Sequence, residues 1–278
     1  MSIYGRHWSS ILKLGAVACT LLLCAPVARA QSSAPMAHHA AGRELMRRDL
    51  IGLPGKEVVM STVEVPAGAS SPPHRHNAQV FVYMLQGRMN MQVKGGPRVT
   101  LGPGEMFYES PSDIQTLSAN ASTTEPAKFL VLSIKDKGNP GSIPVTPNQA
   151  QSAAPAAIRQ ASEASGSPAP ALGALMMRDV IGLPGKEVVV SRIEQEPGAS
   201  GRPHRHYAQV FVYVLQGRVV MQVKGGPRMT LGAGQTFYEN PSDIHVVSAN
   251  ASKTEPAAFL AVLIKDTDKP GTVPVTAD

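Results

Sequence analysis

Cysteine and tryptophan are nearly missing from this chain of 278 residues, which has two cysteines and one tryptophan. Cys19, Cys24 and Trp8 all lie within the first thirty residues. The rest of the chain has no thiol, and this excludes disulfide scaffolding, thiol catalysis and cysteine-type zinc sites there. Any metal must therefore be held by histidine, carboxylate or amide groups.

Long apolar runs are also scarce, and the only marked one, Leu14 to Val27, lies near the N-terminus. Arg6 and Lys13 precede it, and Ala28-Arg29-Ala30 follows it. This is the pattern of a secretory signal peptide over residues 1–30, and it predicts export to the periplasm or beyond. The run is short for a membrane span and no other stretch is apolar enough, so we expect no span in the mature chain.

A lipoprotein signal is the alternative interpretation of the same segment, because it contains Cys19 and Cys24. Leu23, directly before Cys24, is large for the position before a lipidated cysteine. The residues before Cys19 fit such a signal only loosely. Cleavage after Ala30 therefore remains the prediction.

Strong charge of one sign is also lacking once this segment is removed. The whole chain has a formal net charge of +6, and the first thirty residues hold three positive charges and no acid, which leaves 6 − 3 = +3. The remaining sequence has no cluster of Lys and Arg and no platform of aromatic residues for base stacking. We therefore expect no binding of nucleic acid.

Two near-copies of one segment make up most of the chain. Leu45 to Thr146 aligns without a gap with Leu175 to Thr276, at a constant offset of 175 − 45 = 130. About two thirds of the paired residues are identical. The Ala-, Ser-, Pro- and Gln-rich segment between the copies cannot bury enough apolar area to order itself. We predict a flexible tail (31–43), a first domain (44–146), a linker (147–173) and a second domain (174–278).

Within each copy, short apolar runs rich in β-branched and aromatic residues alternate with Gly and Pro, without helical periodicity. Each copy is predicted to be all-β, with roughly seven or eight strands, as in a sandwich, jelly roll or small barrel. Residues 94–97 and 102–104 are turn signals that would join neighbouring strands as hairpins. The predicted strands of the first copy are 57–65, 79–85, 88–93, 98–101, 105–108, 114–118 and 128–134.

Histidine is concentrated at related places in the copies: His74 and His76 in the first, and His204, His206 and His245 in the second. Residues two apart in a strand point the same way, so each His-Arg-His segment would send both imidazoles to one face. His245 would supply a third ligand if its strand lies opposite. Three imidazoles with open positions are an arrangement used by catalytic metals, here Mn, Fe, Ni, Cu or Zn.

The residues around these histidines resemble a known family. The segment 198–206, Gly-Ala-Ser-Gly-Arg-Pro-His-Arg-His, with Tyr-Val-Leu-Gln-Gly at 213–217, is similar to the first sequence motif of the cupins. The second motif is matched, with two spacings one residue off the commonest form, by Gly234, Pro241, His245 and Asn250. The resemblance covers both copies. It implies a bicupin of two tandem double-stranded β-helix (jelly-roll) barrels, each with a metal site inside its mouth, that could associate as a homo-oligomer.

One position departs from the family pattern. Cupins usually have a glutamate four residues after the second histidine of the first motif, and here Val80 and Val210 stand at those positions. The candidates for a fourth ligand in the second copy are Gln209, which would turn inward only if the strand is bulged, and Glu239, which could lie near the third histidine. Water would otherwise complete the three-histidine site.

The first copy differs at the third ligand position, because Gln115 stands where the second copy has His245. An amide is a poorer ligand than imidazole for metals that prefer nitrogen. We therefore predict a weak or degenerate site at His74, His76 and Gln115. The alternative for the histidines of either copy is that they are hydrogen-bonded residues lining a barrel that binds no metal.

Two classes of function remain open. The first is a metalloenzyme that acts on a small oxygen-rich molecule with a dioxygenase-, decarboxylase- or isomerase-like reaction; oxalate decarboxylases and quercetin-type dioxygenases are bicupins of this kind. The second is a non-catalytic periplasmic protein that binds a small molecule or the metal itself. A third hypothesis, compatible with either class, is that the first copy serves mainly to pack against the second and stabilise it.

Overall fold

The computed structural model describes residues 40–146, 148–149 and 173–275. Regular structure in these ranges is almost entirely β-strand, which confirms the predicted fold class. The predicted signal peptide (1–30) and most of the predicted linker lie outside the described residues. No helix within the described part of the chain is long and apolar enough to cross a membrane.

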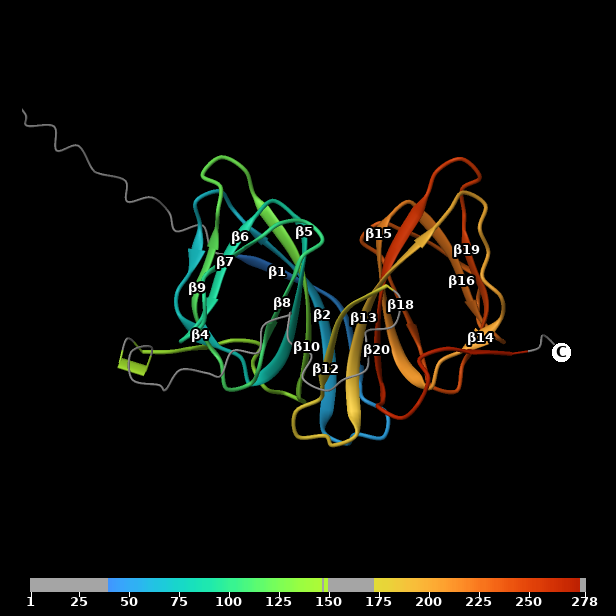
Figure 1. Ribbon diagram of the computed structural model, residues 1–278, viewed down its shortest axis with the longest axis horizontal. Helices are drawn as coiled ribbons and strands as arrows, with labels where there is room; N and C mark the ends of the chain where they lie inside the picture. Colours follow the sequence, from blue (N-terminus) through green and yellow to red (C-terminus); the bar gives the residue numbers. More distant parts are fainter. Residues whose placement is uncertain (1–39, 147, 150–172, 276–278) are drawn as a thin grey trace, which may run out of the picture. The chain divides into compact units, whose positions relative to one another are not determined.

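The first copy forms two antiparallel sheets that face each other as a barrel (Figure 1). One sheet has the order β1-β2-β10-β5-β8, and the other has the order β11-β4-β9-β6-β7, with β3 also paired to β9. The strands are β1 (Ala41–Asp49), β2 (Lys56–Val65), β3 (Ser70–Ser71), β4 (His74–Arg75), β5 (Ala78–Gln86), β6 (Met89–Val93), β7 (Val99–Leu101), β8 (Met106–Glu109), β9 (Ile114–Asn120), β10 (Ala127–Asp136) and β11 (Ile143–Pro144).

The second copy repeats this arrangement, with sheets in the orders β12-β13-β20-β15-β18 and β17-β16-β19-β14-β21. The duplication read from the sequence is therefore also a duplication of the fold. The strands are β12 (Ala174–Asp179), β13 (Lys186–Gln195), β14 (His204–Arg205), β15 (Ala208–Gln216), β16 (Arg218–Val223), β17 (Met229–Gly232), β18 (Thr236–Glu239), β19 (Ile244–Asn250), β20 (Ala257–Asp266) and β21 (Val273–Pro274).

Strand β15 is buried on both faces, which explains why its sequence is apolar without alternation. Val210 and Val212 belong to the apolar core inside the second barrel. Phe211 and Tyr213, which point the other way, belong to a different core, to which both copies contribute side chains. Even-numbered positions of this strand therefore face the barrel interior, and odd-numbered positions face the first copy.

Reciprocal hydrogen bonds accompany this shared core. The backbone N–H of Ile51 donates to Gln209 Oε1 at 3.1 Å, and the backbone N–H of Ile181 donates to Gln79 Oε1 at 2.8 Å. Each copy thus places the turn after its first strand against an amide of the other copy. The contact between the barrels therefore combines an apolar core with hydrogen bonds, which require a specific geometry.

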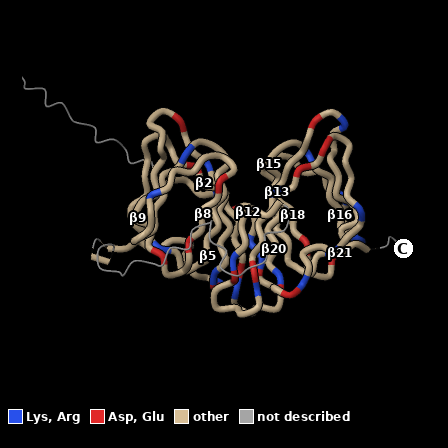
Figure 2. The backbone as a smooth tube through the Cα atoms, in the orientation of Figure 1, with Lys and Arg blue, Asp and Glu red and all other residues tan. Residues whose placement is uncertain are grey.

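Positive and negative charges are mixed along the described chain. Figure 2 shows Lys and Arg interspersed with Asp and Glu over the described chain, whereas most strand positions carry neither. Some of these charges form ion pairs between neighbouring strands, such as Lys56 with Asp136 at 2.6 Å and Lys186 with Asp266 at 2.5 Å. These pairs are partly exposed, so their contribution to stability is small.

Two local predictions are wrong. The predicted tail extends too far, because residues 41–43 already belong to β1, where Ala41 pairs with Glu64 of β2. The turn at 102–104 does not join a hairpin: β7 pairs with β6, whereas β8 pairs with β5 in the other sheet. This turn crosses between the sheets, and its Gly104 N–H donates to Met84 O at 2.9 Å.

Candidate metal centre

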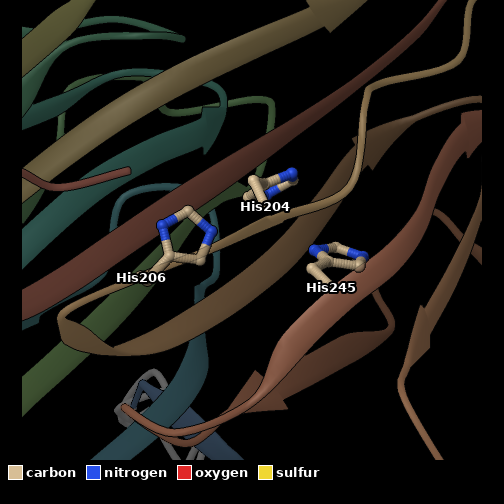
Figure 3. A group of neighbouring side chains, drawn as sticks. All are labelled: His204, His206 and His245. Atoms are coloured by element: carbon tan, nitrogen blue, oxygen red, sulfur yellow. The ribbon is translucent and has the colours of Figure 1, made fainter. Parts of the chain in front are cut away.

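Three histidines of the second copy meet on neighbouring strands, as the sequence predicts. His204 begins β14, and His245 lies directly opposite it on β19, so both side chains leave the same face of the sheet. His206 follows β14 at once. The potential ligand atoms of the three side chains all lie within 4.8 Å of one another. The imidazoles lie side by side, with ring centroids of His204 and His206 4.8 Å apart (Figure 3).

Backbone carbonyls fix the tautomers of two of these rings. Nδ1 of His204 lies 2.8 Å from Arg202 O, and Nδ1 of His206 lies 2.7 Å from Gly271 O. A carbonyl oxygen can only accept a hydrogen bond, so each Nδ1 carries the proton and leaves a lone pair on Nε2. Hydrogen bonds from Nδ1 to a backbone carbonyl orient histidines that bind metal through Nε2, and both rings have such a bond.

Burial keeps His206 in the neutral form that a metal requires. Desolvation lowers its pKa below the ordinary value, and this outweighs the opposing effects of the Glu239 carboxylate and of the hydrogen bond to Gly271. A neutral imidazole offers a lone pair near pH 7 without first losing a proton. The lowered pKa of His206 and the free lone pair on its Nε2 both suit a metal ligand.

The third histidine has a polar atom without a partner. The side chain of His245 is buried, and its Nε2 makes no hydrogen bond. The ring stacks on Phe237, with ring centroids 5.9 Å apart. An unsatisfied buried polar atom costs free energy, so this nitrogen indicates a site that fits a further group. A divalent metal, which is a Lewis acid for neutral imidazole, fits this donor set.

A carboxylate lies beside the histidines. Glu239 is almost fully buried, with 2% of its surface exposed. Its Oε2 lies 3.1 Å from His245 Nδ1 and 3.9 Å from His206 Nε2, and it has no hydrogen-bond partner. Of the two sequence candidates for a fourth ligand, Glu239 is the one that the structure places at the cluster.

The other candidate, Gln209, points away from the histidines, so this prediction is wrong. Strand β15 pairs with β20 without a bulge at this position, and the alternation of the strand sends the side chain to the contact between the barrels. There Gln209 Oε1 accepts hydrogen bonds from Ile51 N and from Tyr238 Oη at 2.9 Å. The amide is thus occupied by structural contacts.

The first copy keeps part of this arrangement. His74 lies opposite Gln115, as His204 lies opposite His245. His74 Nδ1 lies 2.9 Å from Pro72 O, and His76 Nδ1 contacts Gly141 O, so both rings are oriented as in the second copy. Among the described residues, however, only the second copy forms a group of three metal-ligating side chains at this separation.

In the first copy, a buried acid, Glu109, is hydrogen-bonded to the residue at the third ligand position. Gln115 Nε2 donates to Glu109 Oε1 at 3.1 Å, and the other carboxyl oxygen, Oε2, lies 3.8 Å from His76 Nε2. Burial, with a smaller contribution from the nearby Asp113 carboxylate, raises the pKa of Glu109 to about 8. The amide at position 115 thus hydrogen-bonds the carboxyl group, which is protonated at neutral pH.

Glu109 is a residue of the site that sequence reasoning missed. It stands at the position of Glu239 in the first copy, because 109 + 130 = 239. The repeat offset was therefore the signal that could have found it once Glu239 was a candidate. Both acids end a strand that pairs with the strand following the His-Arg-His segment.

Comparison with known proteins agrees with the fold. The cupin domain matches the chain twice, at residues 61–133 and 191–263. A comparison with curated proteins found no match. Both matched segments begin within the second strand of a copy and end within the last long strand, so they cover the barrel scaffold and the histidine positions.

Solved structures with the same fold share little sequence with this chain. Oxalate decarboxylase from Bacillus subtilis superposes with a TM-score of 0.55 and 16% identity, over 87% of this chain and 81% of the other. AerE from Microcystis aeruginosa superposes with a TM-score of 0.51 and 14% identity, over 80% of this chain and 99% of the other. These similarities support the fold alone. Since the two matched segments include more than half of its residues, the chain belongs to the cupin family and is a bicupin.

Proposed function

We propose that this bicupin is an exported metalloprotein whose second barrel holds one divalent transition ion on His204, His206 and His245. The observation that carries the proposal is the cluster itself: three imidazoles with ligand atoms within 4.8 Å, two of them oriented by backbone carbonyls. The buried, unpartnered Nε2 of His245 adds support. The ion would be Mn, Fe, Ni, Cu or Zn.

The metal would serve a reaction on a small oxygen-rich molecule. When bound, such an ion supplies Lewis acidity and a template for substrate oxygens, because three protein ligands leave coordination positions open. The chain's own residues orient the imidazoles and keep His206 neutral. Apolar side chains such as Val210 and Phe237 line the interior beside them and limit the entry of water. The reaction would be dioxygenase-, decarboxylase- or isomerase-like.

Metal analysis of the purified mature protein tests the proposal. We expect about one ion per chain in the wild type and almost none in His245→Ala. His74→Ala in the first copy is the matched control and should leave the metal content of the second barrel unchanged. A wild-type protein that takes up no stoichiometric ion from any of the five metals would overturn the proposal.

A substrate screen then separates an enzyme from a binding protein. Loaded wild type and His245→Ala would be compared on small carboxylates and dioxygenase substrates under oxygen and under argon. Turnover that requires both oxygen and His245 would identify an oxygenase, and turnover under argon would identify a decarboxylase- or isomerase-like reaction. Tight ligand binding without turnover would instead support the alternative, a periplasmic binding protein.

Export is a separate part of the proposal, and it rests on residues 1–30 alone. Cell fractionation of a bacterial host that expresses the full chain tests it. We expect the protein in the periplasm or medium, with a new N-terminus at Gln31. Retention of residues 1–30 in the cytoplasmic fraction would contradict export.

A further inference from the structure

The site contains an acid that the three-histidine proposal does not use. Glu239 ends β18, which pairs with β15 so that Glu239 lies directly opposite Val210. Residues directly opposite in an antiparallel pair project from the same face of the sheet. Val210 belongs to the apolar core inside the barrel. Glu239 therefore also projects into the barrel, beside the position at which β15 has a valine in place of an acid.

The surroundings of Glu239 are unfavourable for a carboxylate that has no cation. Only 3% of the side chain is exposed, and Phe237 on the same strand belongs to the interior core. Among the described residues, the ionisable nitrogens within ion-pair distance of Glu239 are those of His206 and His245, and no Lys or Arg pairs with it. A buried charge without a partner costs several kcal/mol, so the position implies a positive group nearby.

The nearest ionisable groups to Glu239 Oε2 are two imidazoles. The separation of 3.1 Å from His245 Nδ1 lies within hydrogen-bond range, yet Oε2 has no hydrogen-bond partner. With metal–ligand bonds of about 2.0–2.2 Å, two atoms on one ion lie at most about 4.2 Å apart. The distance of 3.9 Å between Oε2 and Nε2 of His206, the ring nitrogen that the contact of Nδ1 with Gly271 O leaves free, is shorter than this limit.

We propose that Glu239 is the fourth protein ligand of the metal, and that the second barrel supplies its carboxylate from β18 instead of β15. The donor set is then three nitrogens and one oxygen, with a net charge of −1 before the ion binds. This inference rests on the proposed function. It adds an anionic ligand that would favour a divalent cation over a neutral occupant of the same space.

The first barrel provides an internal comparison. Glu109 lies opposite Val80 in the same register, but Gln115 donates a hydrogen bond to its Oε1. There the carboxyl group has a partner within the protein. In the second barrel a histidine takes the place of that amide, so the carboxylate receives no amide hydrogen bond there, whereas Oε2 is without a hydrogen-bond partner in both acids. Glu109→Gln is therefore a matched control for Glu239→Gln.

Metal affinity is the first readout. Competition with a chelator for the ion found in the wild type would be measured for the full-length mature protein and for both variants. We expect Glu239→Gln to weaken binding by more than about 100-fold, which is the upper range for loss of a residue that only orients a ligand. Glu109→Gln should bind within about twofold of the wild type. Equal affinity of Glu239→Gln and wild type would overturn the fourth-ligand inference and leave the three-histidine site intact.

The number of bound waters is the second readout, and it distinguishes a ligand from a residue that only orients His245. Loss of a carboxylate ligand opens one coordination position, so Mn²⁺-loaded Glu239→Val should carry one more exchangeable water than the wild type, as measured by water-proton relaxation. An unchanged water count with weaker binding would assign Glu239 an orienting role and overturn the inference. A wild type that binds no ion at all would instead overturn the proposed function.

Discussion

The two barrels share a scaffold but differ in how one buried acid is satisfied. In the first, the amide of Gln115 donates to Glu109, and the acid has a raised pKa. In the second, His245 occupies the equivalent position, and neither its Nε2 nor Glu239 Oε2 has a hydrogen-bond partner. Oε2 of Glu109 likewise has no partner, so the barrels differ in the hydrogen bond to the other carboxyl oxygen. The difference teaches that a single residue position, 115 or 245, decides whether the buried acid receives a hydrogen bond from its neighbour.

The largest expected effect comes from making the second barrel like the first. His245→Gln should reduce the metal content from about one ion per chain to a small fraction, because the amide is a weaker ligand and can bond Glu239 instead. Metal analysis after dialysis measures this. Retention of a full equivalent would mean that position 245 does not determine the difference between the barrels.

The reverse change, Gln115→His, should create a metal site in the first barrel. Gln115→His adds a third imidazole opposite His74 and removes the hydrogen bond to Glu109. We expect metal content to rise by about one ion per chain. If the content stays the same, the first barrel differs from the second in more than this position, and an exchange of further interior residues would be needed.

The acid of the first barrel should make stability depend on pH. The pKa of Glu109 is raised from 4.5 to about 8 by burial, so the folded state binds this proton more tightly than the unfolded state. Its contribution to stability is fully present below about pH 4.5 and is lost as the pH rises through about 8. At roughly 1.4 kcal/mol per pKa unit, the loss is a few kcal/mol at most.

Glu109→Gln removes this titration. The free energy of unfolding of the variant minus that of the wild type should be larger at pH 8 than at pH 4.5, as measured by urea denaturation at both values. Other titrating groups are common to both proteins and cancel in the difference. A stability difference that is the same at both pH values would show that the pKa of Glu109 in the folded protein is not raised above its value in the unfolded chain.

The smallest expected effect concerns the amides at the contact between the barrels. Gln79 bonds Ile181 N, Tyr108 Oη and Asp179 O, whereas Gln209 bonds only Ile51 N and Tyr238 Oη. At about 1 kcal/mol per hydrogen bond, Gln79→Ala should lower the free energy of unfolding by about 1 kcal/mol more than Gln209→Ala. Thermal denaturation at fixed pH compares them, and a larger loss for Gln209→Ala would contradict this ranking.

Much of the fold could be predicted from the sequence, because its signals are local or repeated. Turn residues and β-branched runs gave the long strands, and the constant offset gave the two domains. Strand β1 was missed because its sequence, Ala-Gly-Arg-Glu-Leu-Met-Arg-Arg-Asp, is mostly polar and exposed. It is a strand because it pairs with β2 at the edge of the sheet. The turn at 102–104 was misassigned because its glycines permit a turn but do not specify which sheet follows.

The histidine cluster could also be predicted, but the acid beside it could not be placed. His204 and His206 are two residues apart, so strand geometry alone puts them on one face. The position of Glu239 depends on the pairing of β18 with β15, which joins segments about thirty residues apart and has no local signal. Gln209 was a candidate because it directly precedes Val210, the position at which cupins usually have a glutamate, but the alternation of an unbulged strand sends it outward.

Strands β5 and β15 are buried on both faces, and residues on the two faces are not equally free to change. Their outward positions are identical in the two copies, with Gln, Phe and Tyr at 79, 81 and 83 and again at 209, 211 and 213. Their one difference, Met84 against Val214, lies on the inward face. The outward face must match its counterpart in the other barrel, so a change there requires a second, compensating change. The inward face has no such counterpart, and each interior could acquire or lose chemistry while the contact between the barrels remained the same.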